Sequence, residues 1–467
     1  MNCSSKGIGP PNHTPERVVV ERWQQLMGKA ELTTTGGEPI RIIYPGRKND
    51  DRGADFRDAV IATSQGIIKG DIEVHVKSSD WRAHRHHQDP AYNRVILHVV
   101  MWHNSKAATN LHNGKIAPIL ALDKYIGSSS SHWPRLVHSP VSSSMPCHKT
   151  VKGLASDSLA QFLDSAGEER FSARAAQFQA ELTQTEASQC LYQGVMEALG
   201  YAKNKLPMLK LARRLPLNIL QSMTQDKISS QERLAQLQAL LLGTAGLLPS
   251  QRQNRHQEYQ DNKWIDKLER IWASYGYTKA MSRDDWQLFK VRPNNFPLRR
   301  IAAMSYLILR YRERGMVAEV VDMIKETPVS VGYFRLENGL RVTADGYWAS
   351  HFDFGLDCRR DNPTLIGRWR AADIAVNVLL PFTLAWSKFN SQPQVERKAF
   401  ALYHSYRRLA INAIERHMMN QLGLNISLVN SAQRQQGLIH IYNTLCSQGR
   451  CNSCRLSQLE ARHHIRV

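Results

Sequence analysis

Three side chains that can bind metals or move protons alternate along one short stretch of the sequence. Glu73, His75 and Lys77 occupy every second position of GDIEVHVK. Successive side chains of a strand point to opposite faces, so these three share one face. A carboxylate, an imidazole and an ammonium group do not form a core face. The stretch is therefore predicted to be either a solvated edge of an antiparallel sheet or a functional surface.

A further acid, Asp55, stands at a predicted loop–strand junction before this stretch. The layout resembles the core of PD-(D/E)xK nucleases, in which two carboxylates hold Mg²⁺ or Mn²⁺. Such an ion activates water and clamps the scissile phosphate, and a nearby cation stabilises the developing charge. Asp55 and Glu73 are the predicted metal ligands, with His75 or Lys77 as the neighbouring group. This sequence departs from the pattern because His75 stands where lysine is usual, and Lys77 lies about 13 Å along the strand from Glu73.

Histidines are concentrated immediately after this strand. Three histidines and an aspartate fall within six positions, namely His84, His86, His87 and Asp89, and His98 follows on the next predicted strand. We expect them to complete the site, and together with Glu73 or His75 they would suit Zn²⁺ or Mn²⁺. The alternative is a polar surface segment that happens to be rich in histidine.

Three cysteines close to the C-terminus form a second group of metal-binding residues. Cys446, Cys451 and Cys454 have the spacing C-x4-C-x2-C, which is typical of thiolate ligands in a reducing compartment. Zinc and an iron–sulfur cluster both fit this pattern. The sequence leaves several choices for a fourth ligand: Cys147, Cys358, His463 and His464. The alternative is that the three cysteines are small buried apolar residues.

An arginine-rich helix entrance, RPNNFPLRR, contains the predicted phosphate contacts Arg292, Arg299 and Arg300. Pairing of these arginines with groups inside the fold is the alternative. The chain has a formal net charge of +20. Residues 1–150 hold 19 basic and 13 acidic side chains, a net of +6, and the remainder carries +14. A positive charge distributed in this way favours a polyanionic partner, and nucleic acid is the predicted one.

No membrane segment or secretion signal is expected. No apolar run reaches the roughly 20 residues that a membrane span needs. The N-terminus lacks the apolar core of a signal peptide, so a cytoplasmic location without a disulfide framework is predicted.

Periodicity predicts an α+β protein. Residues 1–14 are expected to be disordered, 15–126 to form an α/β domain like a restriction-endonuclease core, and 127–154 to form a linker or long loop. Residues 155–467 are expected to form a large, mostly helical domain ending in the cysteine group. Helical spacing of apolar residues supports this in eight segments: 162–182, 187–199, 208–223, 232–247, 259–275, 296–312, 366–386 and 397–422.

Several longer motifs resemble a bacterial family named domain of unknown function 2851. They include GADF, GDIEVHVKSSDW, HRHHQDPAYNRVILHVV, ALGYAKNKLPMLKLARRLP, RPNNFPLRRIA and GLIHIYNTLCSQGRCNSC. The family usually has Gly-Pro-Asp-Phe where this chain has Gly53-Ala54-Asp55-Phe56, so the aspartate is kept. The resemblance covers nearly the whole chain and implies no established function.

The residues themselves favour a metal-dependent nuclease. Two other hypotheses remain at this point: a nucleic-acid-binding or scaffolding protein without catalysis, and a zinc-dependent hydrolase of a small substrate.

Overall fold

The computed structural model describes most of the chain. The described residues are 14–26, 32–125, 147, 151, 153–222, 228–252, 262–276, 280–358 and 362–456. Residues 1–13 of the predicted disordered N-terminus, most of the predicted linker, and His463 and His464 lie outside them.

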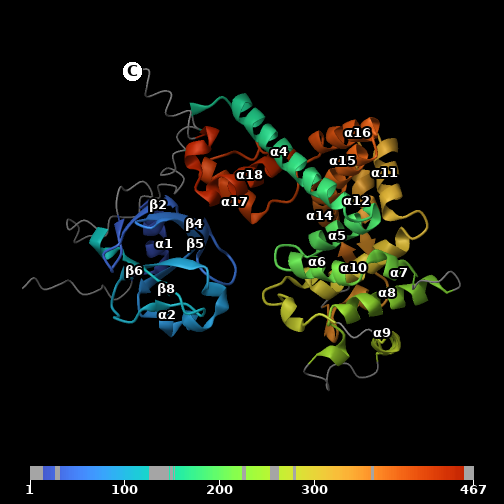
Figure 1. Cartoon of the computed structure of the whole chain (residues 1–467), viewed down its shortest axis with the longest axis horizontal. Coiled ribbons are helices and arrows are strands. Elements are labelled where there is room, and N and C mark those ends of the chain that lie inside the picture. Colours follow the sequence, from blue (N-terminus) through green and yellow to red (C-terminus); the bar gives the residue numbers. More distant parts are fainter. Residues whose placement is uncertain are drawn as a thin grey trace, which may run out of the picture. The chain divides into compact units, whose positions relative to one another are not determined.

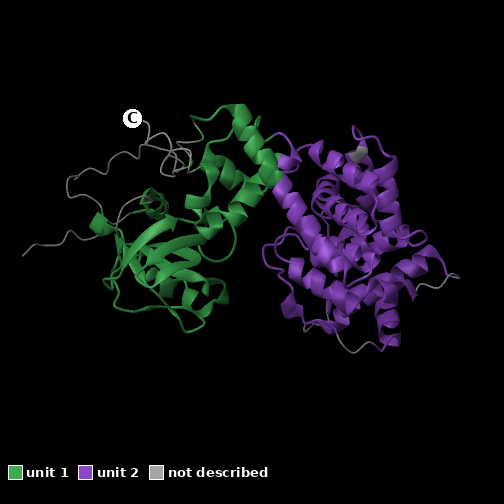
Figure 2. Ribbon diagram, turned by 45° about the horizontal axis from the view of Figure 1, so that its top comes forward, with its two compact units in different colours: residues 1–167, 411–429, 434–467 green, residues 168–410, 430–433 purple. Residues whose placement is uncertain are grey.

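Two compact units divide the chain (Figure 2). Unit 1 contains residues 1–167, 411–429 and 434–467, and unit 2 contains residues 168–410 and 430–433. The predicted α+β class is confirmed, because a mixed sheet near the N-terminus is followed by a mostly helical part (Figure 1). The division does not coincide with the predicted domain boundary at residue 155, since the C-terminal segments belong to the unit that contains the sheet.

Unit 1 is built on a seven-stranded sheet with the order β1-β2-β4-β5-β6-β9, with β3 paired to β4. Its strands are β1 (Leu32–Thr33), β2 (Pro39–Tyr44), β3 (Arg47–Lys48), β4 (Phe56–Thr63), β5 (Gly66–Lys77), β6 (Val95–Trp102) and β9 (Ile119–Ala121). The strands from β1 to β5 pair antiparallel, whereas β6 runs parallel to both β5 and β9. The connection from β5 to β6 contains α2 (Asp80–Ala83), η1 (His86–Gln88) and η2 (Pro90–Tyr92).

One face of this sheet is covered by α1 (Glu16–Gln25). Trp23 of α1 is fully buried and shares an apolar cluster with Ile72 and Val74 of β5 and Leu97 of β6. Because β5 alternates, the side chains between these apolar residues point to the opposite face of the sheet. Glu73 is one of them, so the predicted functional face lies opposite the helix.

Segments close to the C-terminus contribute a second apolar cluster to unit 1. Tyr44 of β2 and Val60 of β4 pack in this cluster with residues of α17 (Ala413–Leu422) and α18 (Ala432–Thr444), including Met418 and Tyr442. The Tyr442 hydroxyl also donates to Asp58 Oδ2 at 2.8 Å. The C-terminal part of the chain therefore completes the core of the sheet unit.

Unit 2 is mostly helical. Its helices include α5 (Ala187–Leu199), α6 (Lys205–Arg214), α7 (Leu217–Ser222), α8 (Ser230–Thr244), α9 (Lys263–Ser274), α10 (Pro297–Arg310), α11 (Met316–Glu326), α12 (Gly332–Leu340), α14 (Arg368–Ile374), α15 (Leu380–Phe389) and α16 (Pro393–His404), and α4 (Ser156–Leu182) spans the division between the units. Three predicted helices are interrupted. The segment 208–223 breaks before Pro216, whose ring cannot continue a helix. In the segment 366–386, a π-helical turn at Ala375–Leu379 lies between α14 and α15. The segment 397–422 separates into α16 and α17.

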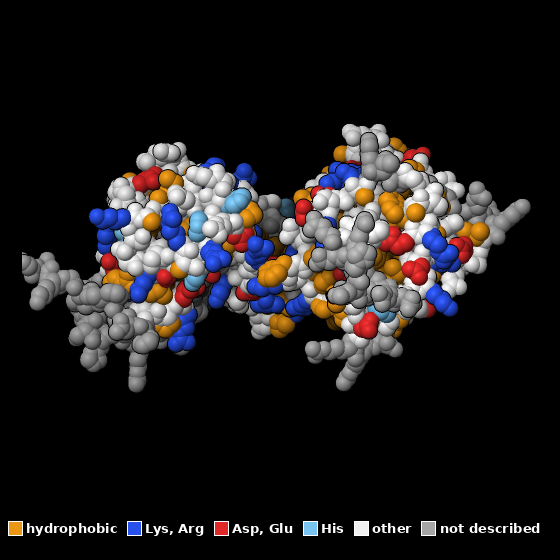
Figure 3. Space-filling view, turned by 90° about the horizontal axis from the view of Figure 1, so that it is seen from below, with side chains coloured by type: hydrophobic (Ala, Val, Ile, Leu, Met, Phe, Trp, Pro, Cys, Tyr) orange, Lys and Arg blue, Asp and Glu red, His pale blue; other side chains and the backbone are white. Residues whose placement is uncertain are grey.

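Basic side chains occur on both units and are interspersed with acidic ones on the face in Figure 3. Within the described part of the chain, no helix combines the length and apolar character required to cross a bilayer.

Candidate metal centre

Antiparallel pairing of β4 and β5 brings two predicted metal ligands together. Asp55 immediately precedes β4, and Phe56 pairs with Ile72 of β5. The backbone N–H of Asp55 donates to Glu73 Oε2 at 3.1 Å, and the N–H of Val74 donates to Asp55 Oδ2 at 3.1 Å. Each carboxylate is thus fixed by the backbone of the other strand.

The crossover between β5 and β6 brings histidines to the same place. Arg85 takes a left-handed conformation with φ 58° between α2 and η1, and His84 and His86 flank this turn. His86 Nε2 lies 3.2 Å from Glu73 Oε1, and His84 Nδ1 lies 3.2 Å from His75 Nε2. His75 Nε2 is also 3.5 Å from Glu73 Oε1. One ring nitrogen from each of His75, His84 and His86 lies within 4.8 Å of the other two.

Behind His75, a chain of hydrogen bonds runs through buried groups. His75 Nδ1 is 2.9 Å from His98 Nε2, and His98 Nδ1 is 3.0 Å from the Thr109 hydroxyl oxygen in β7 (Thr109–Asn110). If Thr109 accepts from His98, then His98 accepts from His75 Nδ1–H. The His75 Nε2 lone pair is then directed towards His84 and Glu73. Ligands in metal sites are commonly oriented in this way, with the second imidazole nitrogen donating to an outer group.

Burial controls the protonation of the centre. Burial and the neighbouring Glu73 carboxylate raise the pKa of Asp55 to about 7. Burial raises the pKa of Glu73 to about 8. Burial and the neighbouring imidazoles lower the pKa of His75 to about 2, so this ring is neutral at ordinary pH and has a lone pair for a ligand. A bound cation would stabilise both carboxylates in their ionised form.

Nitrogen and oxygen donors together define what this group can bind. Mg²⁺ prefers oxygen ligands alone, whereas imidazole combined with carboxylate suits Zn²⁺, Mn²⁺ or Fe²⁺. His75, His84 and His86 with Glu73 fit such an ion, and Asp55 lies directly beside Glu73. A bound ion of this kind would activate a water molecule and polarise a phosphoryl or carbonyl oxygen.

Other predicted site residues lie outside this group. Lys77 is exposed near the end of β5, and in the described part of the chain no hydrogen bond or ion pair joins its ammonium to the centre. Asp89 instead caps η2 through the Ala91 N–H and pairs with Arg52 at 2.8 Å. His87 is half-buried, and no partner is found for its Nδ1 among the described residues.

A further acid near the centre is not indicated by the sequence pattern. Glu16, at the start of α1, acts electrostatically on Asp55, Glu73 and His86. An acid in the first turn of a helix is a common favourable arrangement, so it carries no sequence signal for function.

The predicted arginine contacts are placed in unit 2. Arg299 is fully buried, and its guanidinium donates to four backbone carbonyls, those of Trp348, His351, Asn362 and Thr364. Arg300 is also buried and donates to the carbonyl of Leu365 and to Asn295 Oδ1. Both arginines therefore connect parts of the fold, as the structural alternative proposed, and they are not available as surface phosphate contacts. Arg292 is exposed.

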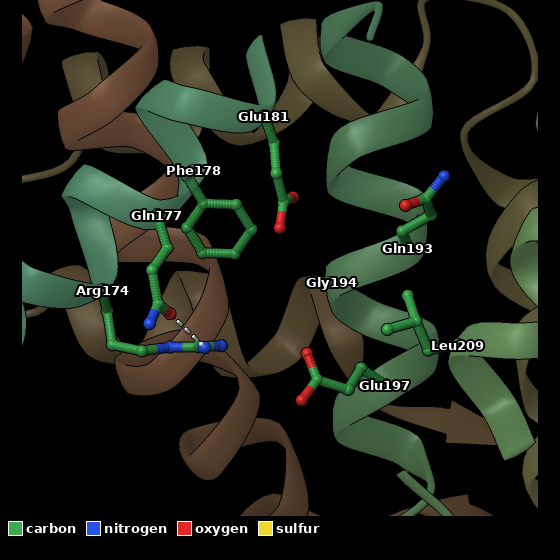
Figure 4. Close-up of a pocket in the computed structure, with 8 residues that line it drawn as sticks. All are labelled: Arg174, Gln177, Phe178, Glu181, Gln193, Gly194, Glu197 and Leu209. Carbon is green, nitrogen blue, oxygen red and sulfur yellow. Dashed lines mark hydrogen bonds between the residues drawn. The ribbon is translucent and has the colours of Figure 1, made fainter. Parts of the chain in front are cut away.

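A separate small hollow in unit 2 has a volume of about 30 Å³ (Figure 4). Arg174, Glu181 and Glu197 are among its lining side chains, and Arg174 donates to Gln177 Oε1 at 2.8 Å. It contains none of the residues predicted to carry chemistry.

Comparison with protein families supports the resemblance in the sequence. The model of the family described as protein of unknown function DUF2851 matches residues 16–408. The chain belongs to this family. The match includes Asp55, Glu73 and all the histidines of the metal centre, whereas Cys446, Cys451 and Cys454 lie beyond its end. No curated protein and no solved structure matches the chain.

Proposed function

We propose that this protein is a metal-dependent phosphodiesterase that acts on nucleic acid. The observation that carries the proposal is the convergence of Asp55 and Glu73 with three histidines, one on β5 and two on the crossover that follows it. Glu73 and the three histidines would hold the ion, which would supply an activated water and charge stabilisation for phosphodiester hydrolysis.

The topology of unit 1 supports this assignment. The order α1, β2, β4, β5, crossover, β6, with three antiparallel strands and then a parallel one, is that expected for a restriction-endonuclease-like core. In this proposal, Asp55 just before β4 and Glu73 on β5 correspond to the metal ligands of such a core. His75 stands in the usual lysine position and would act as a ligand rather than as a cation.

Exposed positive charge near the centre supports a polyanionic substrate. Arg82 in α2 and Arg85 in the following turn are exposed on the segment that carries His84 and His86, and Lys77 is exposed on β5. Cations in such positions neutralise phosphates along a strand and orient it without reading its sequence. The formal net charge of +20 also favours a polyanionic substrate.

A second candidate function, a zinc-dependent hydrolase of a small substrate, is favoured by one feature. Three imidazoles together are a donor set that zinc hydrolases commonly use. This candidate differs from the first in its substrate and not in the position of its metal.

One activity panel tests both candidates. The purified full chain would be incubated with labelled single- and double-stranded DNA and RNA, and separately with bis(4-nitrophenyl) phosphate, in Mn²⁺, Zn²⁺ or Mg²⁺. Metal-dependent cleavage of a polymer is the expected result. Turnover of the small ester alone would replace the first candidate by the second. Salt-dependent nucleic-acid binding without cleavage under any metal would overturn catalysis and leave a non-catalytic binding protein.

A further inference from the structure

Four cysteines from distant parts of the sequence gather in unit 1. Cys446 opens η9 (Cys446–Gln448), Cys451 opens η10 (Cys451–Ser453), and Cys454 follows directly. Cys147 precedes α4 by several residues and joins the same apolar cluster as Cys446 and Cys454. The sequence left Cys147, Cys358 and two histidines as choices for a fourth ligand, and the fold brings Cys147 to the other three cysteines.

A buried glutamine of α17 joins two of these thiols. Gln421 Nε2 contacts Cys147 Sγ at 3.9 Å and Cys446 Sγ at 3.6 Å. The Gln421 side-chain oxygen in turn accepts from the Tyr44 hydroxyl of β2 at 3.5 Å. An amide N–H directed at two sulfur atoms is the kind of outer group that orients and stabilises thiolate ligands.

The four thiols also act on one another electrostatically. Burial raises the pKa of Cys147 to about 11, and the thiols of Cys454 and Cys451 contribute to this rise. Burial likewise raises the pKa of Cys446, with contributions from Cys147, Cys451 and Cys454. Three of the four thiols are buried, and a nearby cation would favour the ionisation of such groups.

We propose that Cys147, Cys446, Cys451 and Cys454 ligate one metal centre, an iron–sulfur cluster. The proposal does not rest on the proposed hydrolase function, because it concerns different residues. Binding would convert four thiols to thiolates and release four protons to solvent.

A single zinc ion would require the sulfur atoms to lie closer together than they do in this structure. Four sulfurs at about 2.3 Å from one tetrahedral zinc would lie about 3.8 Å from each other. Among the described residues, three potential ligand atoms lie within 4.8 Å of one another only in the histidine group, so no three of these thiols approach so closely. A cluster is larger than one ion and holds its thiolates further apart.

The site would stabilise the contact between the C-terminal segment and the sheet. Gly449, between Cys446 and Cys451, has φ +66°, and a Cβ there would lie 2.8 Å from a methyl group of Val60. The ligand-bearing turn therefore approaches β4 as closely as the backbone allows. A metal bound in this position would cross-link the turn at residues 446–454 to Cys147, which lies earlier in unit 1.

Metal analysis of the full chain, purified without oxygen, tests the proposal. We expect iron and acid-labile sulfide in nearly equal amounts, visible absorbance, and loss of both in Cys147→Ser and Cys451→Ser. Cys358→Ser is the matched control, because Cys358 lies in unit 2 against Arg299 and should keep the metal. Stoichiometric zinc without iron or colour would overturn the cluster, and a folded protein without either metal would overturn the site.

A measurement on the unsubstituted protein covers variants that fail to fold. Iodoacetamide labelling read by mass spectrometry should spare these four cysteines in the metal-loaded protein and modify them together after chelation. Equal labelling before and after chelation would contradict the proposal.

Discussion

The backbone amide of Asp55 donates to the carboxylate of Glu73 at 3.1 Å. The amide that follows Glu73, that of Val74, donates back to the Asp55 carboxylate. This reciprocal pair arises from the register of β4 on β5, in which Phe56 pairs with Ile72. The two acids are therefore positioned by strand pairing and do not depend on the crossover that carries the histidines.

Glu73→Gln should abolish metal-dependent cleavage, by at least about 100-fold, because it removes the charged oxygen that faces the histidines. The change keeps the size of the side chain, so the sheet should remain folded by circular dichroism. Glu21→Gln, in α1, is the control and should keep full activity. Cleavage by Glu73→Gln at the unsubstituted rate would remove this residue from the mechanism.

Thr109→Val should weaken metal binding about 10–100-fold, since loss of an outer hydrogen bond to a ligating histidine has this effect in other sites. Thr109 contacts no proposed ligand directly and acts through His98 and His75. Isothermal titration with Mn²⁺ or Zn²⁺ gives the affinity, and Thr343→Val, at an exposed position of unit 2, provides the control. An unchanged affinity would show that His75 is not oriented by this chain.

The paired change Arg82→Gln and Arg85→Gln should reduce nucleic-acid affinity and leave metal affinity unchanged. Removal of two phosphate contacts should lower the slope of log affinity against log salt by about 2 for duplex DNA. Fluorescence anisotropy at several salt concentrations measures this slope. Lys325→Gln, which removes an exposed charge from unit 2, should keep the slope. The same slope in the double variant would place the nucleic acid elsewhere on the protein.

Acid should destabilise the protein in part through His417 of α17, which contacts the Tyr44 hydroxyl at 2.5 Å. Burial lowers the pKa of His417 to about 4. The unfolded chain, with a pKa of about 6.5, therefore binds more protons between these values, and stability falls as the pH drops below 6.5. The resulting loss of unfolding free energy between pH 6.5 and pH 5 is about 1.6 kcal/mol.

Urea denaturation at these two pH values should show a smaller loss of unfolding free energy for His417→Gln than for the unsubstituted protein. His112→Gln, at an exposed position, should behave as the unsubstituted protein does. Equal losses in all three proteins would mean that His417 is not buried in its neutral form.

Local patterns in the sequence were sufficient to predict part of the candidate site. Alternation along β5 placed Glu73 and His75 on one face, and the loop before β4 identified Asp55. The roles of Thr109 and Glu16 depend on which strands and helices become neighbours, and no local spacing encodes this. The same limit applies to Arg299, because a basic residue at a helix entrance has the same pattern whether it faces water or buried carbonyls.

Local sequence patterns also could not predict how the chain is divided into its two units. Helical periodicity predicted α17 and its apolar face, but one apolar stripe packs equally well on helices or on a sheet. Helical periodicity therefore could not predict that residues 411–429 belong to unit 1. The broken helix at 208–223 had a local cause in Pro216, and its position could have been predicted from that residue.

Because unit 1 contains segments that precede and follow most of unit 2 in the sequence, its assembly depends on the order of translation. The sheet strands leave the ribosome first, and the partners of Tyr44 and Val60 in α17 and α18 follow only after residues 168–410 of unit 2. During that interval an apolar surface of the nascent chain has no cover and is open to chaperones. A chain that terminates prematurely would keep this surface exposed, which gives cellular quality control a means of distinguishing incomplete products from finished ones.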